Sequence, residues 1–222
     1  MNKISKKTLL GLFLLVSLQT MAQSRYCTSF DDYLEGNWTE LPTLAVSINS
    51  KSEKKKKEEA ALDYTFTTND KAIDKKLKKE AFIIQCGDSM FISLRNLRHE
   101  NSQFANNFAR AYPLPDNKIL FTSRRAFKSK NMLYASFGAA GAVVGGVPVN
   151  LKIDQKTPHC FIVENIDLGS YIPTKIIDDD LITKVLKNHD DLIDEYFSEE
   201  KKKKRETSEH ILPLLKRAGI IE

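Results

Sequence analysis

The chain has 222 residues, enough for one domain with a substantial core, and carries 34 Lys and Arg against 29 Asp and Glu. Three of the lysines and none of the acids lie in the first 22 residues, so the positive excess in the remainder is only +2. A nucleic-acid-binding protein normally presents a concentrated basic surface, so this class is excluded and no nucleic-acid partner is expected.

Residues 1–22 have the pattern of a bacterial secretory signal peptide. Basic residues precede an apolar run from Leu9 to Leu18, and Thr20-Met21-Ala22 supplies small residues for cleavage after Ala22. The apolar run is about ten residues, whereas a bilayer span requires roughly 20. We therefore expect a cleaved signal and a single mature domain over 23–222. The destination is the periplasm, or alternatively the outer membrane or the cell exterior.

The region 23–170 is predicted to be mostly β. It opens with one short helix, for which Ser29 is the N-cap and Gly36 the stop, and Trp38 then seals the edge of the core. Alternating apolar residues predict strands at 44–48 and 62–68, paired around a charged tip at 51–59, and a lysine-rich helix or turn at 72–79.

The clearest strand signal is an apolar run followed by a two-residue turn and a second apolar run. Ala81 to Cys86 and Ser89 to Leu97 flank Gly87-Asp88, which suits a type II′ hairpin with one apolar side. A second hairpin is predicted from 104–112 and 118–123, with Ile119 and Phe121 inward, and later strands are predicted at 147–153 and 160–166.

From Asp178 the apolar period changes from two to about 3.6, so 171–222 is predicted to be helical. Acidic residues open two helices, and the basic run 201–205 suits the end of the second. Pro213 is expected to confine a last helix largely to its C-terminal side. The predicted class is α+β, a mainly antiparallel sheet built of hairpins followed by C-terminal amphipathic helices.

The segment 132–149 is uncharged and rich in Gly and Ala. Its small residues recur at helical spacing, which makes a flat surface that another backbone can approach closely. Three interpretations stay open: packing on the sheet, self-association, and shallow membrane insertion. The candidate interaction residues are Gly138, Gly141, Ala142, Gly145 and Gly146.

The chain has three cysteines, and export would place them in an oxidising compartment. Cys86 and Cys160 both fall in strand-like runs and form the candidate disulfide, which leaves Cys27 as an odd thiol. The alternative is three buried, unpaired cysteines, because a free Cys behaves as a small hydrophobe.

Catalytic constellations are weak in this sequence. His159 and Cys160 are adjacent, so strand alternation points them to opposite faces, and pairing Cys86 with His99 requires a fold that the sequence does not predict. Asp178-Asp179-Asp180 lacks the Gly and the distal Glu of a calcium loop, and helix capping explains it. We expect no catalytic residue, no cofactor and no metal.

Four stretches occur together in this chain: the signal ending at Ala22-Gln23, the opening Tyr26 to Tyr33, the run Ala81 to Ile92 and the Gly-rich segment. In this combination the chain resembles a family of exported, uncharacterised proteins from anaerobic Gram-negative gut bacteria. The resemblance implies no established activity and carries over no functional residues.

These observations predict an exported, non-enzymatic protein of the cell envelope that acts as a binding, assembly or interaction module. Its partner would be an unknown envelope protein or a second copy of itself. The alternatives are a peripheral membrane protein that inserts 132–149, or a secreted hydrolase whose site is assembled from distant residues such as Cys86 or Cys160 with His99 or His159.

Overall fold

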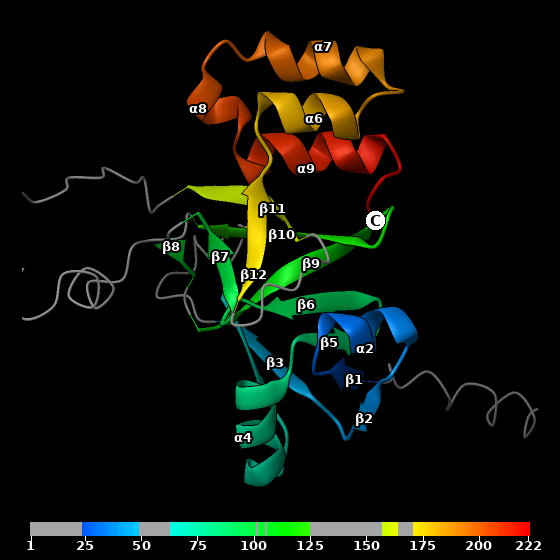
Figure 1. Ribbon diagram of the computed structural model, residues 1–222, viewed down its shortest axis with the longest axis vertical. Coiled ribbons are helices and arrows are strands. Elements are labelled where there is room, and N and C mark those ends of the chain that lie inside the picture. The colour runs from blue at the N-terminus through cyan, green and yellow to red at the C-terminus, as the bar shows by residue number, and fades with distance from the viewer. Residues whose placement is uncertain (1–23, 49–62, 101, 105, 125–156, 164–170) are drawn as a thin grey trace, which may run out of the picture.

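The computed structural model describes residues 24–48, 63–100, 102–104, 106–124, 157–163 and 171–222. The strands run in the order β2-β1-β5-β6-β9-β10-β11-β12-β7-β8, and β4 joins β3 to β9 (Figure 1). Their bounds are β1 Ser24–Cys27, β2 Thr39–Leu41, β3 Ala45–Ile48, β4 Tyr64–Thr67, β5 Ile83–Cys86, β6 Ser89–Ser93, β7 Leu97–His99, β8 Ser102–Gln103, β9 Phe108–Leu114, β10 Lys118–Arg124, β11 Pro158–Val163 and β12 Ile172–Ile176.

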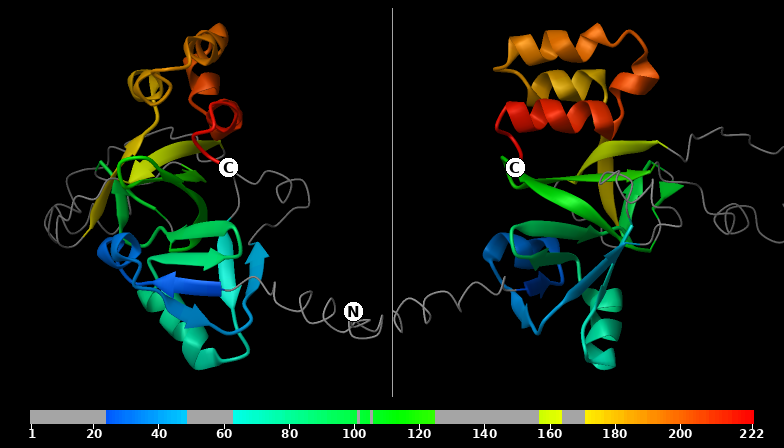
Figure 2. Two further views of the ribbon diagram at one scale, coloured as in Figure 1. Left: turned by 90° about the vertical axis from the view of Figure 1, so that its right-hand side faces the viewer. Right: turned by 180° about the vertical axis from the view of Figure 1, so that it is seen from behind.

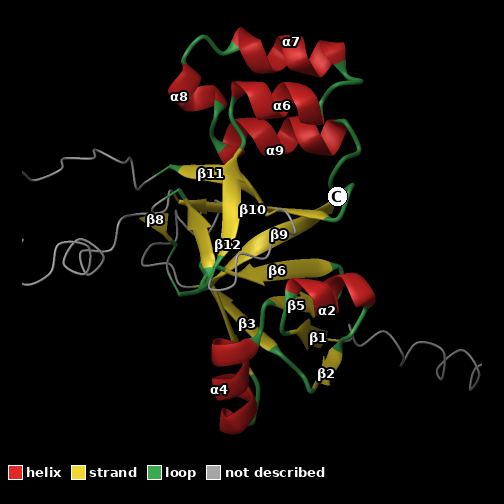
Figure 3. Ribbon diagram, in the orientation of Figure 1, coloured by secondary structure: helices red, strands yellow, loops and turns green. Residues whose placement is uncertain are grey.

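Helices lie at both ends of the sheet (Figure 3). Their bounds are α2 Phe30–Glu35, α4 Lys71–Glu80, α6 Asp179–Val185, α7 Asp190–Ser198, α8 Lys202–Arg205 and α9 Ser208–Arg217. The four C-terminal helices gather beyond β11, whereas α4 projects from the opposite end, as the rotated views confirm (Figure 2). The α+β class with a mostly antiparallel sheet is confirmed, and the β12–β7 pair is parallel.

The predicted hairpins form in the expected order. β3 pairs with β4, β5 with β6 and β9 with β10, each antiparallel. Gly87 adopts a φ of 57° in the β5–β6 turn, a conformation open to Gly because it lacks a Cβ. Ser29 caps α2 by accepting from the Asp32 backbone N–H, and Gly36 ends that helix at a φ of 73°.

The β5–β6 hairpin differs from the prediction because both of its faces are buried. Ile83 belongs to a core cluster with Phe30 of α2, whereas its neighbour Ile84 packs with Leu77 of α4 on the other side. Both isoleucines have 0% exposure. A continuous apolar run suits a strand covered on both sides, so alternation could not be used to assign one solvent face.

The predicted helical region 171–222 is wrong at its start, because Ile172–Ile176 is strand β12 and helix begins at Asp179. The prediction for Pro213 is also wrong, since α9 runs through it from Ser208 to Arg217. Ile211, Leu214 and Leu215 are completely or almost completely buried there. Their packing outweighs the backbone hydrogen bond that proline removes.

Candidate binding cleft

A cleft of about 700 Å³ opens at the free end of the β5–β6 hairpin. β9 pairs with β6 as far as Ala111 and then continues to Leu114 without it. Tyr33 and Leu34 of α2, Trp38 and the C-terminal residues 219–222 also line the cleft. The cleft therefore brings together both ends of the described chain.

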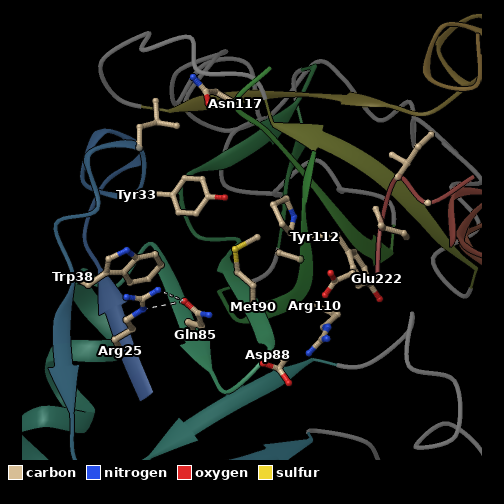
Figure 4. A pocket seen from close by; sticks show the side chains of 16 residues that line it. Arg25, Tyr33, Trp38, Gln85, Asp88, Met90, Arg110, Tyr112, Asn117 and Glu222 are labelled. Atoms are coloured by element: carbon tan, nitrogen blue, oxygen red, sulfur yellow. Dashed lines mark hydrogen bonds between the residues drawn. The ribbon is translucent and has the colours of Figure 1, made fainter. Parts of the chain in front are cut away.

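One end of this cleft is built around Arg25 (Figure 4). Its Nε and Nη2 donate to Oε1 of Gln85 at 3.0 and 2.9 Å, and its guanidinium lies 4.5 Å from the centre of the Trp38 ring. Gln85 Nε2 donates to the Gly87 carbonyl at 3.2 Å, which orients the amide with its oxygen toward Arg25. Gln85 therefore holds the Arg25 guanidinium by hydrogen bonds in its plane, and the Trp38 ring covers one of its faces.

Strand register explains this arrangement. Arg25 lies opposite Gln85 in the β1–β5 pair, and Gln85 lies opposite Met90 in the β5–β6 pair. Directly opposed residues point to the same face of a sheet, so these three side chains form a row. Gly36 turns the chain at the end of α2, and Trp38 then packs edge-on against Tyr33 with ring centres 6.0 Å apart.

The electrostatics of this end are unusual for an arginine in a half-buried position. No described carboxylate lies within ion-pair distance of Arg25, although Glu40 is opposite it in the β1–β2 pair, and its direct partners, Gln85 and Trp38, are both neutral. Burial raises the pKa of the Tyr33 phenol, so this hydroxyl stays protonated. Arg25 therefore forms no direct ion pair within the described ranges, and Tyr33 presents a neutral hydroxyl group to the same cleft.

Arg110 of β9 forms the other end of the cleft, on the opposite face of the sheet. Arg110 is opposite Phe91 in the β6–β9 pair, so it occupies the face opposite to Met90 and Ala111. Its guanidinium lies 5.4 Å from the Phe91 ring centre and 5.6 Å from that of Tyr112. Asp88 and Glu222 also line the cleft and are exposed. The two arginines thus belong to separate ends (Figure 4).

The predicted disulfide between Cys86 and Cys160 is wrong, because both cysteines are free, as is Cys27. Cys86 lies in β5 and Cys160 in β11, with β6, β9 and β10 between them. Strands are spaced by about 4.8 Å, so the separation far exceeds the roughly 7 Å limit between Cα atoms in a disulfide. The sequence showed two strands but not their places in the sheet.

The cysteines and histidines named as candidate catalytic pairs do not meet. His99 packs edge-on against Phe161, whereas Cys160 belongs to the core cluster on the other face of β11. Burial raises the pKa of the Cys160 thiol, which disfavours the nucleophilic thiolate. Nδ1 of His159 lies 2.8 Å from the Glu206 carbonyl, inside the protein.

The three adjacent aspartates divide into separate structural roles. Asp178 caps α6 by accepting from the Leu181 backbone N–H, as predicted, and Asp180 is exposed. Asp179 accepts from both Arg205 and Tyr196. No group of three or more potential metal ligands occurs within the described ranges. The candidate interaction residues Gly138 to Gly146 lie outside those ranges, and their role stays a prediction.

Sequence analysis assigned Trp38 to the core edge and missed Arg25 and Gln85. One signal was available, since Gln85 is a polar residue inside the otherwise apolar run from Ala81 to Cys86. A buried amide needs a hydrogen-bonding partner, which directs attention to the strand paired with it. Naming Arg25 as that partner required the β1–β5 register.

Residues 25–222 match the model of a family described as a family of unknown function (DUF6563). The chain belongs to this family. Neither the curated proteins nor the solved structures contain a match to the chain. Within the part of the family domain that the structure describes, no helix is both long enough and apolar enough to cross a membrane.

Proposed function

We propose that this DUF6563 protein is an exported, non-enzymatic binding module of the cell envelope and that it takes its ligand in the cleft beside Arg25. The observation that carries the proposal is the chemistry of the cleft wall. Aromatic, aliphatic, guanidinium, amide and carboxylate groups line it, and the lining residues include no Cys, His, Ser or Lys. Such a wall supplies contact area and charge, but it offers no Ser or Cys beside a His, and its two carboxylates, Asp88 and Glu222, are exposed.

Export is supported by the order of segments along the chain. The basic and apolar residues of the predicted signal precede Ala22, and the family match begins at residue 25. Fractionation of the producing cells tests this part directly. We expect a processed chain that begins at Gln23 in the envelope or medium, and full-length chain in the cytosol would contradict export.

Binding can be measured without a label, because Trp38 is the sole tryptophan of the chain and lines the cleft. Three probes of different chemistry are titrated: N-acetyl-phenylalanine, its amide, and maltotriose. We expect at least one probe to produce a saturable change in Trp38 fluorescence and to be recovered chemically unchanged. A response to none of the three would contradict the binding proposal, and conversion of a bound probe would indicate an enzyme.

A further inference from the structure

We propose that the Arg25 end of the cleft recognises the carboxylate of a ligand with an apolar body; this inference rests on the proposed binding function. A guanidinium has five N–H donors. Gln85 uses two of them, the Nε–H and one Nη2–H, through a single oxygen. These two donors form one side of the guanidinium fork.

The other side of the fork is the part that remains for a ligand. It consists of an Nη1–H and the second Nη2–H, the pair of parallel donors that a carboxylate can accept bidentately. None of these donors has a hydrogen-bond partner among the described residues, whereas Arg205 in the helical layer engages Asp179 through two of its nitrogens. The contrast distinguishes a structural arginine from one that is oriented but unpaired.

Neutral supports make this orientation useful for binding. An arginine held by a carboxylate already has its charge compensated, so an incoming anion gains little. Arg25 is held by an amide and an indole ring, and neither forms an ion pair with it; Glu40, which is opposite Arg25 in the β1–β2 pair, lies beyond ion-pair distance. Because the guanidinium is already ordered, little rotamer freedom remains to be lost when an anion binds.

The apolar body is inferred from the neighbouring wall. Met90 is buried at the floor of the row, and Leu34 and Tyr33 cover it from α2. The Tyr33 hydroxyl has no hydrogen-bond partner among the described residues and points into the same cleft away from Arg25, where it can donate to a polar group on the body of the ligand (Figure 4). A small hydrated anion such as inorganic phosphate would leave this apolar wall unused.

The test is a calorimetric titration of the mature protein with N-acetyl-phenylalanine, its amide, and inorganic phosphate. The acid and the amide share the same apolar body and differ in the carboxylate. We expect the acid to bind at least tenfold more tightly than the amide and phosphate to compete weakly. Arg25→Gln should abolish the difference between acid and amide, and Arg25→Lys should retain part of it.

A matched control is available elsewhere in the chain. Arg98 lies 4.9 Å from the ring centre of Tyr171 and does not line the cleft, so Arg98→Gln removes a stacked arginine at an unrelated position. It should leave the acid–amide difference unchanged. If Arg25→Gln fails to fold, the acid–amide ratio of the wild type and of Arg25→Lys still decides the matter.

The outcomes separate the two proposals. Equal affinity for acid and amide in the wild type overturns carboxylate recognition and leaves the binding module in place. Phosphate binding as tightly as the acid overturns the apolar-body part. Failure of the wild type to bind any of the probes, including maltotriose, overturns the binding function together with the inference.

Discussion

Arg205 donates two hydrogen bonds to Asp179, Nε to Oδ1 at 2.8 Å and Nη2 to Oδ2 at 2.6 Å, although the two residues are 26 positions apart in the sequence. Tyr196 adds a third from its hydroxyl to Oδ1 at 3.0 Å. The contacts join α8 and α7 to the first turn of α6. They hold the helical layer together beyond what its apolar core provides.

The first prediction concerns acid stability. The Arg205 guanidinium lowers the pKa of the Asp179 carboxyl to about 2, against about 3.9 in an unfolded chain. Because the folded-state pKa is the lower one, the ionised Asp179 carboxyl stabilises the folded protein above about pH 4. This contribution is lost as the pH falls toward 2 and the carboxyl becomes protonated. Asp179→Asn should therefore reduce the free energy of unfolding at pH 7 by about 1–2 kcal/mol. The deficit relative to wild type should shrink between pH 4 and pH 2.

Urea unfolding at pH 7, 4 and 2 measures this difference. Asp180→Asn is the matched control, since Asp180 is exposed and adjacent, and it should follow the wild type at each pH. A deficit for Asp179→Asn that stays constant down to pH 2 would show that the pairing with Arg205 is not the cause.

The second prediction separates capping from charge at the same triplet. Asp178 accepts from the Leu181 backbone N–H at 2.9 Å and so satisfies one donor at the start of α6. Asp178→Ala should cost about 1 kcal/mol, whereas Asp178→Asn should cost a few tenths, because Asn is also a good N-cap. Thermal melts of both variants test this. Equal losses would contradict capping as the role of Asp178.

The sequence predicted local features of the fold, such as helix caps and turns, but it did not predict which distant strands pair. Ser29 with Gly36, and Gly87 in a hairpin turn, act through neighbouring residues, so their patterns predicted the observed caps and turn. The pairing of β12 with β7 joins segments more than 70 residues apart and has no local signature. For this reason β12 was assigned to the helical region.

The candidate cleft shows the same limit. Each of its key residues has an ordinary local explanation: Arg25 follows the signal, Trp38 follows a helix, and Gln85 lies in a strand. Their meeting depends on β1 pairing with both β2 and β5, which orders three separate segments side by side. Sequence spacing alone does not encode that order, and the disulfide prediction failed for the same reason.

The third prediction concerns the aromatic centre of the sheet. Phe121 is fully buried, stacked on Phe161 at 5.4 Å between ring centres and packed edge-on against Phe104. Phe121→Ala should lower the free energy of unfolding by about 3–5 kcal/mol, because it removes apolar contacts and leaves a cavity. Phe197 is 43% exposed, and Phe197→Ala should cost about 1 kcal/mol or less. Similar losses in urea unfolding would contradict the assigned core.

The fourth prediction concerns the thiols. Cys27 and Cys160 are 1% and 0% exposed, and burial raises the pKa of Cys27 to about 12, whereas Cys86 is half-buried. The thiolate is the reactive form, so a disulfide reagent such as Ellman's reagent at pH 8 should modify Cys86 first. The two buried thiols should react only as fast as the protein opens.

Two controls identify the reacting group. Cys86→Ser should remove the fast phase without altering the slow one, and 6 M guanidinium chloride should expose three thiols without added reductant. That count follows from three free cysteines distributed over β1, β5 and β11. Recovery of a cross-linked peptide containing Cys86 and Cys160 from the non-reduced protein would contradict it, because such a bond requires β5 and β11 to lie next to each other rather than three strands apart.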